Sequence, residues 1–470
     1  MTVPPIARLL QPRLDALRRE LEVPGEFSPE VLVEAEAAAG RPLAPEPDER
    51  DIPLLTIDPP GSMDLDQAMH LERREDGFRV RYAIADVASF VTPGGAVDHE
   101  AHARGQTVYL PGANAPLHPT VLSEGAASLL PGKERPAVLW TLDINRYGQL
   151  ASTHVRRALV RSRRRLDYEE AQAEIEAGGQ GDHSLALLAE VGSLRERIEE
   201  ERGGITLDTP DQEVVEDDGG LALEYRSQLP VEGFNEQISL LTGIAAARLM
   251  LDAGAGVLRT MPPPEQGSID YLRRTARGLR IDWPSELGYQ DFVRSLDAGR
   301  PAHAAMLRDS TALLRGAAYA SFEGEPPAQY EHAALATPYA HTTAPLRRLV
   351  DRYVLELCVA ACAGVRPPDW ALAALPALPE EMQASGRRAA GAERAVVDLV
   401  EAAILAPRVG EEFRAVVVDV DSKGKGGVVQ LADPPVIGRL DGRDLPLGEE
   451  VRVRLHSADV DSRKIEFTLA

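Results

Sequence analysis

The 470-residue chain lacks the features that mark membrane and secreted proteins. It has no run of about 18 apolar residues, the length that a transmembrane helix needs, and the residues after Met1 lack the apolar core of a signal peptide. The two cysteines, Cys358 and Cys362, lie four positions apart in one apolar run. We expect both on one face of a core helix, and neither a disulfide framework nor a metal site. These absences predict a cytoplasmic protein with no membrane association.

Positive charge is scarce as well. Asp and Glu number 74 against 51 Lys and Arg, so the formal net charge is −23. Nonspecific nucleic-acid binding depends on basic groups that neutralise phosphates, which argues against a general nucleic-acid coat protein. A local basic channel stays compatible with this charge, because one short stretch holds Arg156, Arg157, Arg161, Arg163, Arg164 and Arg165. That run lies either in such a channel or on a solvated surface.

A strand, a carboxylate and a turn follow one another at residues 54–61. Leu54–Ile57 is an apolar, partly β-branched run that is typical of a buried strand. Pro59, Pro60 and Gly61 come next and must turn the chain. Asp58 is therefore expected at the end of a strand.

Two more carboxylates follow within eight positions, Asp64 and Asp66. If residues 63–67 are extended, Asp64 and Asp66 share one face and Gln67 lies on the other. We then expect Asp58, Asp64 and Asp66 to converge on one point. Two such charges about 4 Å apart repel by roughly 4 kcal/mol at an effective dielectric near 20, so the cluster needs cations or protons.

Oxygen ligands of this kind suit magnesium or manganese. A calcium-binding helix-loop-helix is excluded, because counting from Asp64 places Met69 where that loop requires Gly. Asp-rich loops are also common as solvated turns. The spacing alone leaves the metal site and the solvated turn open.

The order Thr56-Ile57-Asp58 and then Asp64-Leu65-Asp66 resembles the signature of the ribonuclease II/ribonuclease R family of 3′-to-5′ exoribonucleases. The family has a fourth Asp where this chain has Gln67. The resemblance implies that Asp58, Asp64, Asp66 and Gln67 hold Mg²⁺, with Mn²⁺ as the alternative ion. It also implies a catalytic role for Asp66.

A second stretch, Tyr339 to Asp351, is similar to a motif of the same family. It departs from that motif at Ala344 and Leu349. The resemblance implies that Arg347 is catalytic and that Arg348 binds RNA. Pro345 suits the first turn of a helix that runs to about Cys362, and free amide groups there would favour a phosphate.

Two further residues enter as RNA-binding candidates through the resemblance. Tyr109 matches a family tyrosine that contacts the 3′ end of the RNA; without the resemblance it would be an edge-strand tyrosine. Glu236 falls near a family glutamate close to the catalytic centre, although the alignment can slip by one residue to Gln237.

The length predicts several domains. Residues 1–50 are expected to form a small α-helical module, either a helix-turn-helix-like binding unit or packing for the next domain. The resemblance implies an α+β RNB-type catalytic domain over residues 51–404, and the usual N-terminal cold-shock domains do not fit into the first 50 residues. Residues 405–470 show five short strands separated by turns, which predicts an all-β OB/S1 barrel, either RNA-binding or a structural cap.

The predicted function is a monomeric, Mg²⁺-assisted 3′-to-5′ exoribonuclease that hydrolyses single-stranded RNA to nucleoside 5′-monophosphates. With such a site in the chain, the arginine run is assigned to the channel. A catalytically weak RNA-binding or scaffolding member of the family is the alternative, because Gln67 and Ala344 depart from its motifs. A DNA exonuclease or a phosphatase on similar carboxylates is the second rival.

Overall fold

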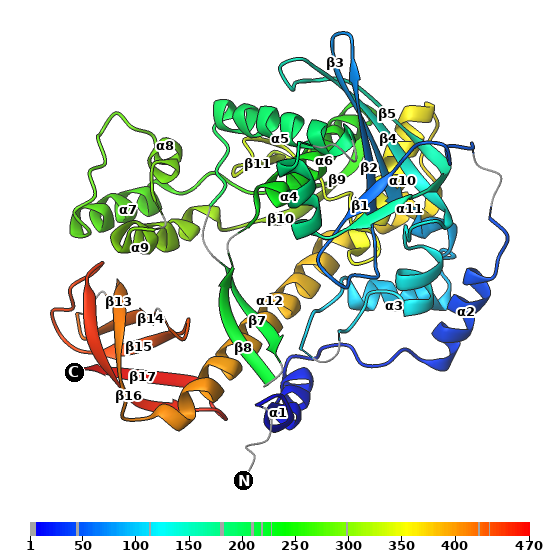
Figure 1. Cartoon of the computed structure of the whole chain (residues 1–470). Coiled ribbons are helices and arrows are strands. Elements are labelled where there is room, and N and C mark those ends of the chain that lie inside the picture. The colour runs from blue at the N-terminus through cyan, green and yellow to red at the C-terminus, as the bar shows by residue number, and fades with distance from the viewer. Residues whose placement is uncertain are drawn as a thin grey trace.

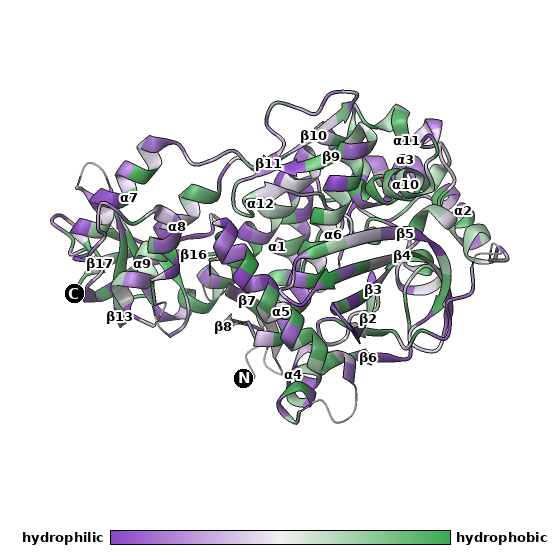
Figure 2. Ribbon diagram, turned by 90° about the horizontal axis from the view of Figure 1, so that it is seen from above, coloured by the Kyte–Doolittle hydropathy of each residue, from purple (hydrophilic) through white to green (hydrophobic). Residues whose placement is uncertain are grey.

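The computed structural model describes residues 6–43, 47–111, 114–178, 183–207, 211–217, 220–226, 228–297, 299–421, 424–431 and 433–470. In these ranges, no helix combines the length and the apolar character needed to cross a lipid bilayer. The molecule has a large α+β part and a small barrel, which lie at opposite ends in Figure 2.

A six-stranded sheet forms the centre of the large part (Figure 1). Its strands are β1 (Leu55–Ile57), β2 (Gln67–Arg74), β3 (Gly77–Ala85), β4 (Glu134–Asn145), β5 (Leu150–Arg161) and β6 (Arg164–Leu166). They follow the spatial order β5-β4-β3-β2-β1-β6. Neighbours are antiparallel except β1 and β6, which are parallel. Asp58 and Asp167 therefore follow two strands that end at the same edge of the sheet.

Both faces of the sheet are buried. In β3, Val80, Tyr82 and Ile84 join one apolar cluster, whereas Ala83 and Ala85 join another, because successive side chains of a strand point to opposite faces. Three helices pack on the first face: α5 (His183–Arg202), α6 (Pro230–Ala253) and α10 (Leu349–Ala363). The second face packs against η1 (Val87–Ser89), α2 (Pro29–Ala39), α3 (Ala96–Arg104) and η2 (Val121–Ala126).

The two cysteines lie on α10, which the sequence predicts as a core helix. Cys358 is buried and Cys362 is half-buried against the same apolar cluster. Two short helices complete this part of the molecule: α4 (Tyr168–Glu176), which packs on α5 and α6, and α11 (Asp369–Ala374), which packs on α10.

The two N-terminal helices do not form one module. The apolar side of α1 (Ile6–Glu20) buries Leu10, Leu14 and Leu17 in the cluster that fills the barrel end of the molecule. By contrast, α2 buries Val31 and Ala35 in the second cluster of the sheet. Each helix thus finds its apolar partners in a different part of the later chain, as the packing alternative expects, and a binding role for residues 1–50 stays a prediction.

A strand pair and three helices connect the sheet to the barrel. β9 (Ala255–Thr260) pairs with β10 (Ala318–Glu323), and the short strands β11 (Glu331–His332) and β12 (Thr337–Pro338) pair with each other. Three helices lie between β9 and β10 in sequence: α7 (Gln266–Gly278), α8 (Tyr289–Arg294) and α9 (Pro301–Ser310), followed by η3 (Thr311–Leu314). The apolar cluster that these helices form includes Val418 of the barrel. The helices therefore pack the barrel against the large part of the molecule.

The long helix α12 (Leu378–Leu405) runs from the large part to the barrel, beside the hairpin of β7 (Asp211–Asp217) and β8 (Gly220–Arg226) (Figure 1). After η4 (Ala406–Arg408), five strands close the barrel in the order β13-β14-β15-β17-β16. They are β13 (Glu412–Val420), β14 (Gly426–Leu431), β15 (Ile437–Asp441), β16 (Glu450–Asp459) and β17 (Lys464–Leu469). The predicted five-stranded all-β barrel after an α+β domain is confirmed.

Candidate active site

Asp58 stands where β1 ends and the Pro59-Pro60-Gly61 turn begins. Its N–H donates to the carbonyl oxygen of Leu166 on the neighbouring parallel strand, at 3.2 Å. Gly61 has a φ of +81°, which favours glycine at this turn. The sequence prediction of a strand, then a carboxylate, then a turn is confirmed here.

The segment that carries Asp64 and Asp66 belongs to no strand, because β2 begins only at Gln67. Ser128 holds it in place. The Ser128 hydroxyl donates to the carbonyl oxygen of Met63 at 2.6 Å and accepts from the N–H of Leu65 at 3.0 Å. Asp66 and Gln67 both border the same cavity, but the Gln67 amide oxygen accepts from Tyr82, so the expected alternation stays a prediction.

Asp66 connects the two sequence motifs. Its Oδ1 accepts a hydrogen bond from the N–H of Leu346 at 2.7 Å, although the two residues are 280 positions apart. The Nε of Arg347 lies 3.5 Å from its other oxygen, Oδ2. Asp66 is buried, whereas the Arg347 side chain is 46% exposed. The guanidinium thus keeps N–H groups free to meet a ligand.

The turn before α10 differs from the sequence prediction. The helix begins at Leu349, so Pro345 lies in the preceding turn and not in the first helical turn. The cause is a tertiary contact: the N–H of Thr107 donates to the carbonyl oxygen of Arg347 at 2.9 Å, and that of Leu349 donates to Gly105 at 3.0 Å. This pairing requires an extended backbone at Arg348, with φ −142° and ψ 119°.

The same pairing brings Tyr109 to the site. Tyr109 is 51% exposed, and its hydroxyl lies 3.3 Å from Oδ2 of Asp64. The aromatic ring therefore stands beside the carboxylates on a segment that is hydrogen-bonded to the Arg347 turn.

These residues surround one cavity of about 750 Å³. Every acidic residue of the first motif lines it, and so do Tyr109 and Arg347. The remaining lining residues include Gln67, Asn114, Glu124, Tyr168 and Asn235. The last four were not predicted from the sequence, because they come from loops and helices that meet only in the fold.

Burial dominates the electrostatics of the cavity. It raises the pKa of Asp58 to about 7, an effect that the charge of Asp64 reinforces and the charges of Arg347 and Arg165 oppose. Burial also raises the pKa of Asp66 well above its ordinary value, while Arg347 and the N–H of Leu346 act in the opposite direction. The cavity therefore places costly negative charge where a cation would stabilise it.

The arrangement of the carboxylates is looser than the sequence predicts. Across the part of the chain that the structure describes, no three His, Cys, Asp or Glu side chains are close enough together to hold a metal ion as they stand. The three Asp residues line one cavity without converging on one point. The donor set still fits a hard cation, because the buried Oδ2 of Asp58 has no hydrogen-bond partner and carboxylate oxygens are the ligands such ions prefer.

Gln67 has a partner inside the protein. Its Oε1 accepts a hydrogen bond from the hydroxyl of Tyr82, which is fully buried. One of the two lone pairs of this oxygen therefore accepts from Tyr82 and is not available to an ion.

Arg348 is engaged as well. Its guanidinium donates two hydrogen bonds to the carboxylate of Asp351, which is completely buried, and Asp351 also accepts from the N–H of Ala344 at 2.8 Å. Arg348 lines a second hollow of about 340 Å³ that shares Tyr109 and Arg347 with the main cavity. Its first role is to hold the Arg347 turn.

Glu236 does not line the cavity. It is exposed on α6, and its neighbour Asn235 reaches the cavity instead, with Nδ2 3.5 Å from the carbonyl oxygen of Ile57. Gln237, the other alignment choice, is buried and donates to Glu199 at 2.7 Å. Each step along a helix rotates the side chain by about 100°, so one position decides which residue faces the ligand.

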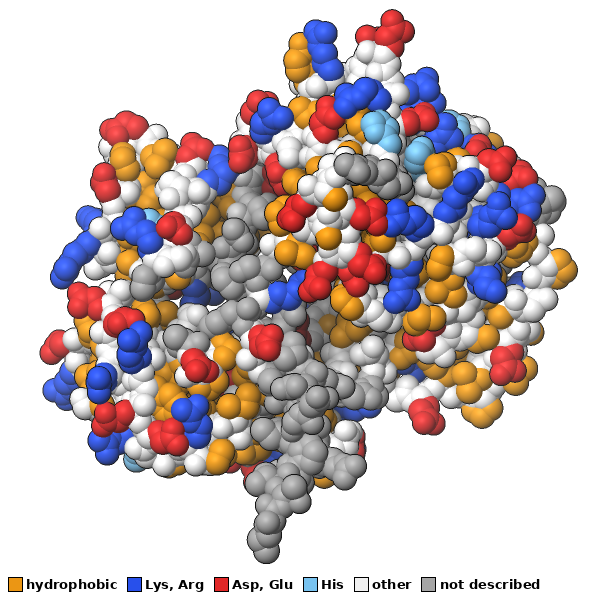
Figure 3. Space-filling model, viewed as in Figure 1, with side chains coloured by type: hydrophobic (Ala, Val, Ile, Leu, Met, Phe, Trp, Pro, Cys, Tyr) orange, Lys and Arg blue, Asp and Glu red, His pale blue; other side chains and the backbone are white. Residues whose placement is uncertain are grey.

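Much of the arginine run is engaged within the protein. Most of its members are bound within the protein: Arg156 to Glu49, Arg157 to Asp86 and Glu356, Arg163 to the carbonyl oxygen of Asp51, and Arg164 to Glu174. The face seen in Figure 3 mixes acidic and basic side chains and has no uniformly basic area. Arg165 contacts Met63, which lines the cavity, and the basic channel stays a prediction.

Comparison with known proteins identifies the protein family. The sequence matches the RNB domain over residues 47–363 and the RNase II-type exonuclease C-terminal S1 domain over residues 411–470. The chain belongs to the RNB-domain family, which confirms the resemblance drawn from the two motifs.

Individual relatives are ribonucleases. Ribonuclease R of Escherichia coli (strain K12) is 29% identical over 491 residues, which cover 93% of this chain and 58% of that protein. Ribonuclease R of Vibrio parahaemolyticus is 28% identical over 517 residues, with 97% of this chain and 58% of that protein covered. The chain thus spans less than two thirds of the length of these relatives.

Solved structures show the same fold. The apo form of Mycoplasma genitalium RNase R matches with a TM-score of 0.86 at 19% identity, covering 97% of this chain and 78% of that one. Yeast Ssd1, described as a pseudonuclease, matches with a TM-score of 0.72 at 19% identity, covering 94% of this chain and 56% of that one. At these identities the likeness establishes the fold.

Proposed function

We propose that this chain is a 3′-to-5′ exoribonuclease that hydrolyses single-stranded RNA and releases nucleoside 5′-monophosphates with the help of Mg²⁺. The observation that carries the proposal is the contact between Asp66 and the Leu346–Arg347 turn. It joins the two motifs on which the family resemblance rests in one cavity. Relatives named ribonuclease R support the same activity.

Asp58, Asp64 and Asp66 are the residues that would hold the ion. A bound Mg²⁺ would supply positive charge for the scissile phosphate and activate a water molecule. Gln67 stands at the edge of this set, since its oxygen also serves Tyr82.

Arg347 acts on the phosphate. Its single contact with Asp66 is long, at 3.5 Å, and its side chain is about half exposed. A guanidinium has five N–H donors, so most of them are available for phosphate oxygens. Charge that develops on the phosphate during hydrolysis would be stabilised there.

Tyr109 acts on the base. Its exposed ring stands at the cavity beside Asp64, and bases stack on such rings without regard to sequence. The cavity volume of about 750 Å³ falls in the range of roughly 300–1,000 Å³ that is common for ligand sites, which suits the end of one strand.

The test is an incubation of single-stranded RNA labelled at its 5′ end, with Mg²⁺ and separately with EDTA. We expect a ladder of shortened, still labelled products with Mg²⁺ and none with EDTA. Asp66→Asn should lower turnover by orders of magnitude, whereas Asp76→Asn, at an exposed Asp in the turn between β2 and β3, should not change it. Full turnover in Asp66→Asn would refute the proposed site, and equal cleavage of a DNA oligonucleotide would favour a general exonuclease.

A catalytically weak RNA-binding member is the second candidate. It is favoured by Gln67 and Ala344, which depart from the family motifs. The same incubation separates the two, because this candidate predicts RNA binding without shortened products at any Mg²⁺ concentration.

A further inference from the structure

Arg165 lies beside the cavity on an element that the sequence motifs do not include. It belongs to β6, and its backbone pairs with Thr56 of β1, two residues before Asp58. Its Nη1 lies 3.6 Å from Sδ of Met63, a residue that lines the cavity. Its charge is close enough to Asp58 to lower the pKa of that carboxyl, as the charge of Arg347 does.

The guanidinium of Arg165 has little to bind within the protein. Among the residues that the structure describes, it has no acidic partner, and a methionine sulfur is a weak acceptor. Its neighbour Arg164 pairs with Glu174 on α4. A half-buried cation with unused N–H donors at the edge of a ligand cavity is placed to bind an anion.

The excess of acidic residues around the cavity explains why a further basic residue would help RNA to bind. Asp58, Asp64, Asp66 and Glu124 all line it, and Arg347 brings one positive charge. An RNA strand adds one negative charge per nucleotide, so further positive charge at the cavity would favour its entry. Arg347 sits on the turn before α10, and Arg165 on β6, so the two guanidinium groups are held by separate elements.

We propose that Arg165 binds a phosphate of the RNA backbone other than the one that Arg347 meets, and so positions the strand in the cavity. This inference rests on the proposed function, because it takes RNA as the ligand. Arg165 is a positioning residue: it fixes where the strand lies, while the hydrolysed bond stays with Asp66 and Arg347.

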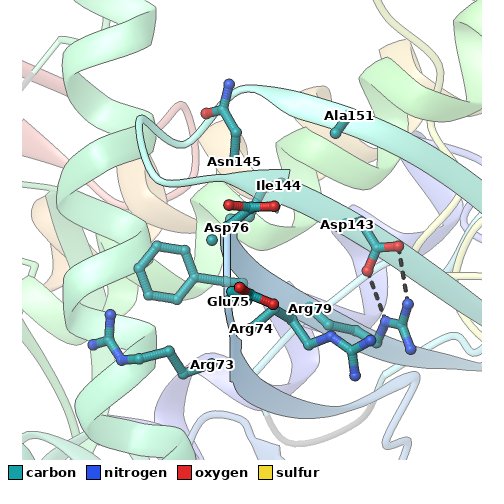
Figure 4. Close-up of a pocket in the computed structure, with 11 residues that line it drawn as sticks. Arg73, Arg74, Glu75, Asp76, Arg79, Asp143, Ile144, Asn145 and Ala151 are labelled. Atoms are coloured by element: carbon teal, nitrogen blue, oxygen red, sulfur yellow. Dashed lines mark hydrogen bonds and ion pairs between the residues drawn. The ribbon is translucent and has the colours of Figure 1, made fainter.

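A second cluster of arginines shows the contrast. A cavity of about 590 Å³ at the β2–β3 hairpin is lined by Arg73, Arg74 and Arg79 (Figure 4). There, Arg79 forms two hydrogen bonds with Asp143, at 2.7 and 3.0 Å, and Arg73 pairs with Glu190. These guanidinium groups are already neutralised by carboxylates, so the hairpin carries no comparable anion site.

The test measures RNA binding without cleavage. Arg165→Gln and Arg165→Lys are made in the Asp66→Asn background, and binding of a fluorescein-labelled oligouridylate is followed by anisotropy in EDTA over a series of salt concentrations. We expect Arg165→Gln to bind about three- to tenfold more weakly and its plot of log affinity against log salt to be shallower by about 0.7, the loss of one phosphate contact on a single strand. Arg165→Lys keeps the charge, so its slope should match that of the parent.

Arg74→Gln is the matched control. Arg74 is 51% exposed on its side chain and lies seven residues along β2 from Gln67, or about 23 Å at roughly 3.3 Å per residue. Arg74→Gln removes the same charge from the same sheet, but far from the cavity. It should change neither the affinity for RNA nor the slope of log affinity against log salt. Thermal melting of each variant checks that the fold is kept.

A second readout separates positioning from a structural role. In the chain with Asp66 intact, Arg165→Gln should raise KM with little change in kcat, since it acts on binding. Affinity and slope equal to those of Arg74→Gln would overturn the inference while leaving the proposed function in place. A parent chain that binds no RNA would overturn both, and a slope for Arg165→Lys as shallow as for Arg165→Gln would refute the phosphate contact.

Discussion

The pair of Arg348 and Asp351 allows a quantitative test of what holds the turn that carries Arg347. The Asp351 side chain is 0% exposed and that of Arg348 is 18% exposed. Asp351 accepts from Arg348 and from the N–H of Ala344. Removing the carboxylate in Asp351→Ala leaves a buried guanidinium and a buried N–H without their partner.

The magnitude follows from these contacts. Breaking a buried pair by removing one partner costs about 3–5 kcal/mol, because the remaining charge stays buried without compensation. Unfolding entropy of about 2.1 cal/mol/K per residue, over a cooperative unit of roughly 320 residues, converts that loss into a fall of about 4–8 °C in Tm. Asp351→Asn keeps an acceptor for the N–H of Ala344, so its free energy of unfolding should fall by less, about 1–3 kcal/mol.

Arg366 and Asp369 provide the matched control. They have the same i,i+3 spacing and an N···O distance of 3.0 Å, but their side chains are 72% and 85% exposed. Asp369→Ala should therefore cost less than about 1 kcal/mol. Calorimetric melting of parent, Asp351→Ala and Asp369→Ala makes the comparison, with RNA cleavage as a second readout. Equal Tm values for Asp351→Ala and Asp369→Ala would refute the assignment of Arg348 and Asp351 as the support of the turn.

Three further predictions concern single side chains. Arg347→Ala should lower kcat by about 10²–10³ with little effect on RNA affinity, and a variant with the parent's rate at saturating RNA would remove Arg347 from the mechanism. Because the Gln67 oxygen serves Tyr82, Mg²⁺ titrations of the activity of Gln67→Asp and the parent should superimpose, and half-maximal activity at lower Mg²⁺ would make Gln67 a metal ligand. Burial raises the pKa of Glu401 to about 7 from 4.5, so the folded protein retains a proton that the unfolded chain releases, and stability falls as pH rises between these values. Glu401→Gln should thus be more stable than the parent above pH 7, by up to about 3 kcal/mol, with no difference below about pH 4.5; a gap in Tm that does not change with pH would contradict this.

The barrel shows where local sequence is sufficient. The five short strands predicted within residues 405–470 are all present, as β13 to β17. Alternating side chains and turn residues are local signals, and each strand carries its own.

The site shows where local sequence fails. Pro345 suits a helix start, but the pairing of Gly105–Thr107 with the Arg347 turn delays the helix to Leu349. The sequence assigns Arg157 to a basic channel, yet its partners Asp86 and Glu356 are 71 and 199 positions away. Contacts of this range have no local signature, so the residues of the site could be chosen by resemblance while their roles could not.

The turn between Ala344 and Leu349 is held by acceptors on either side, Asp66 for the N–H of Leu346 and Asp351 for the N–H of Ala344. Its backbone is therefore ordered before any ligand arrives, and the cost of ordering it is part of folding. Binding a phosphate then requires only the Arg347 side chain to lose rotational freedom, roughly 0.5–1.5 kcal/mol. Under the proposed function, more of the interaction energy would then stay available for the transition state, because two carboxylates that face the backbone have already ordered the turn.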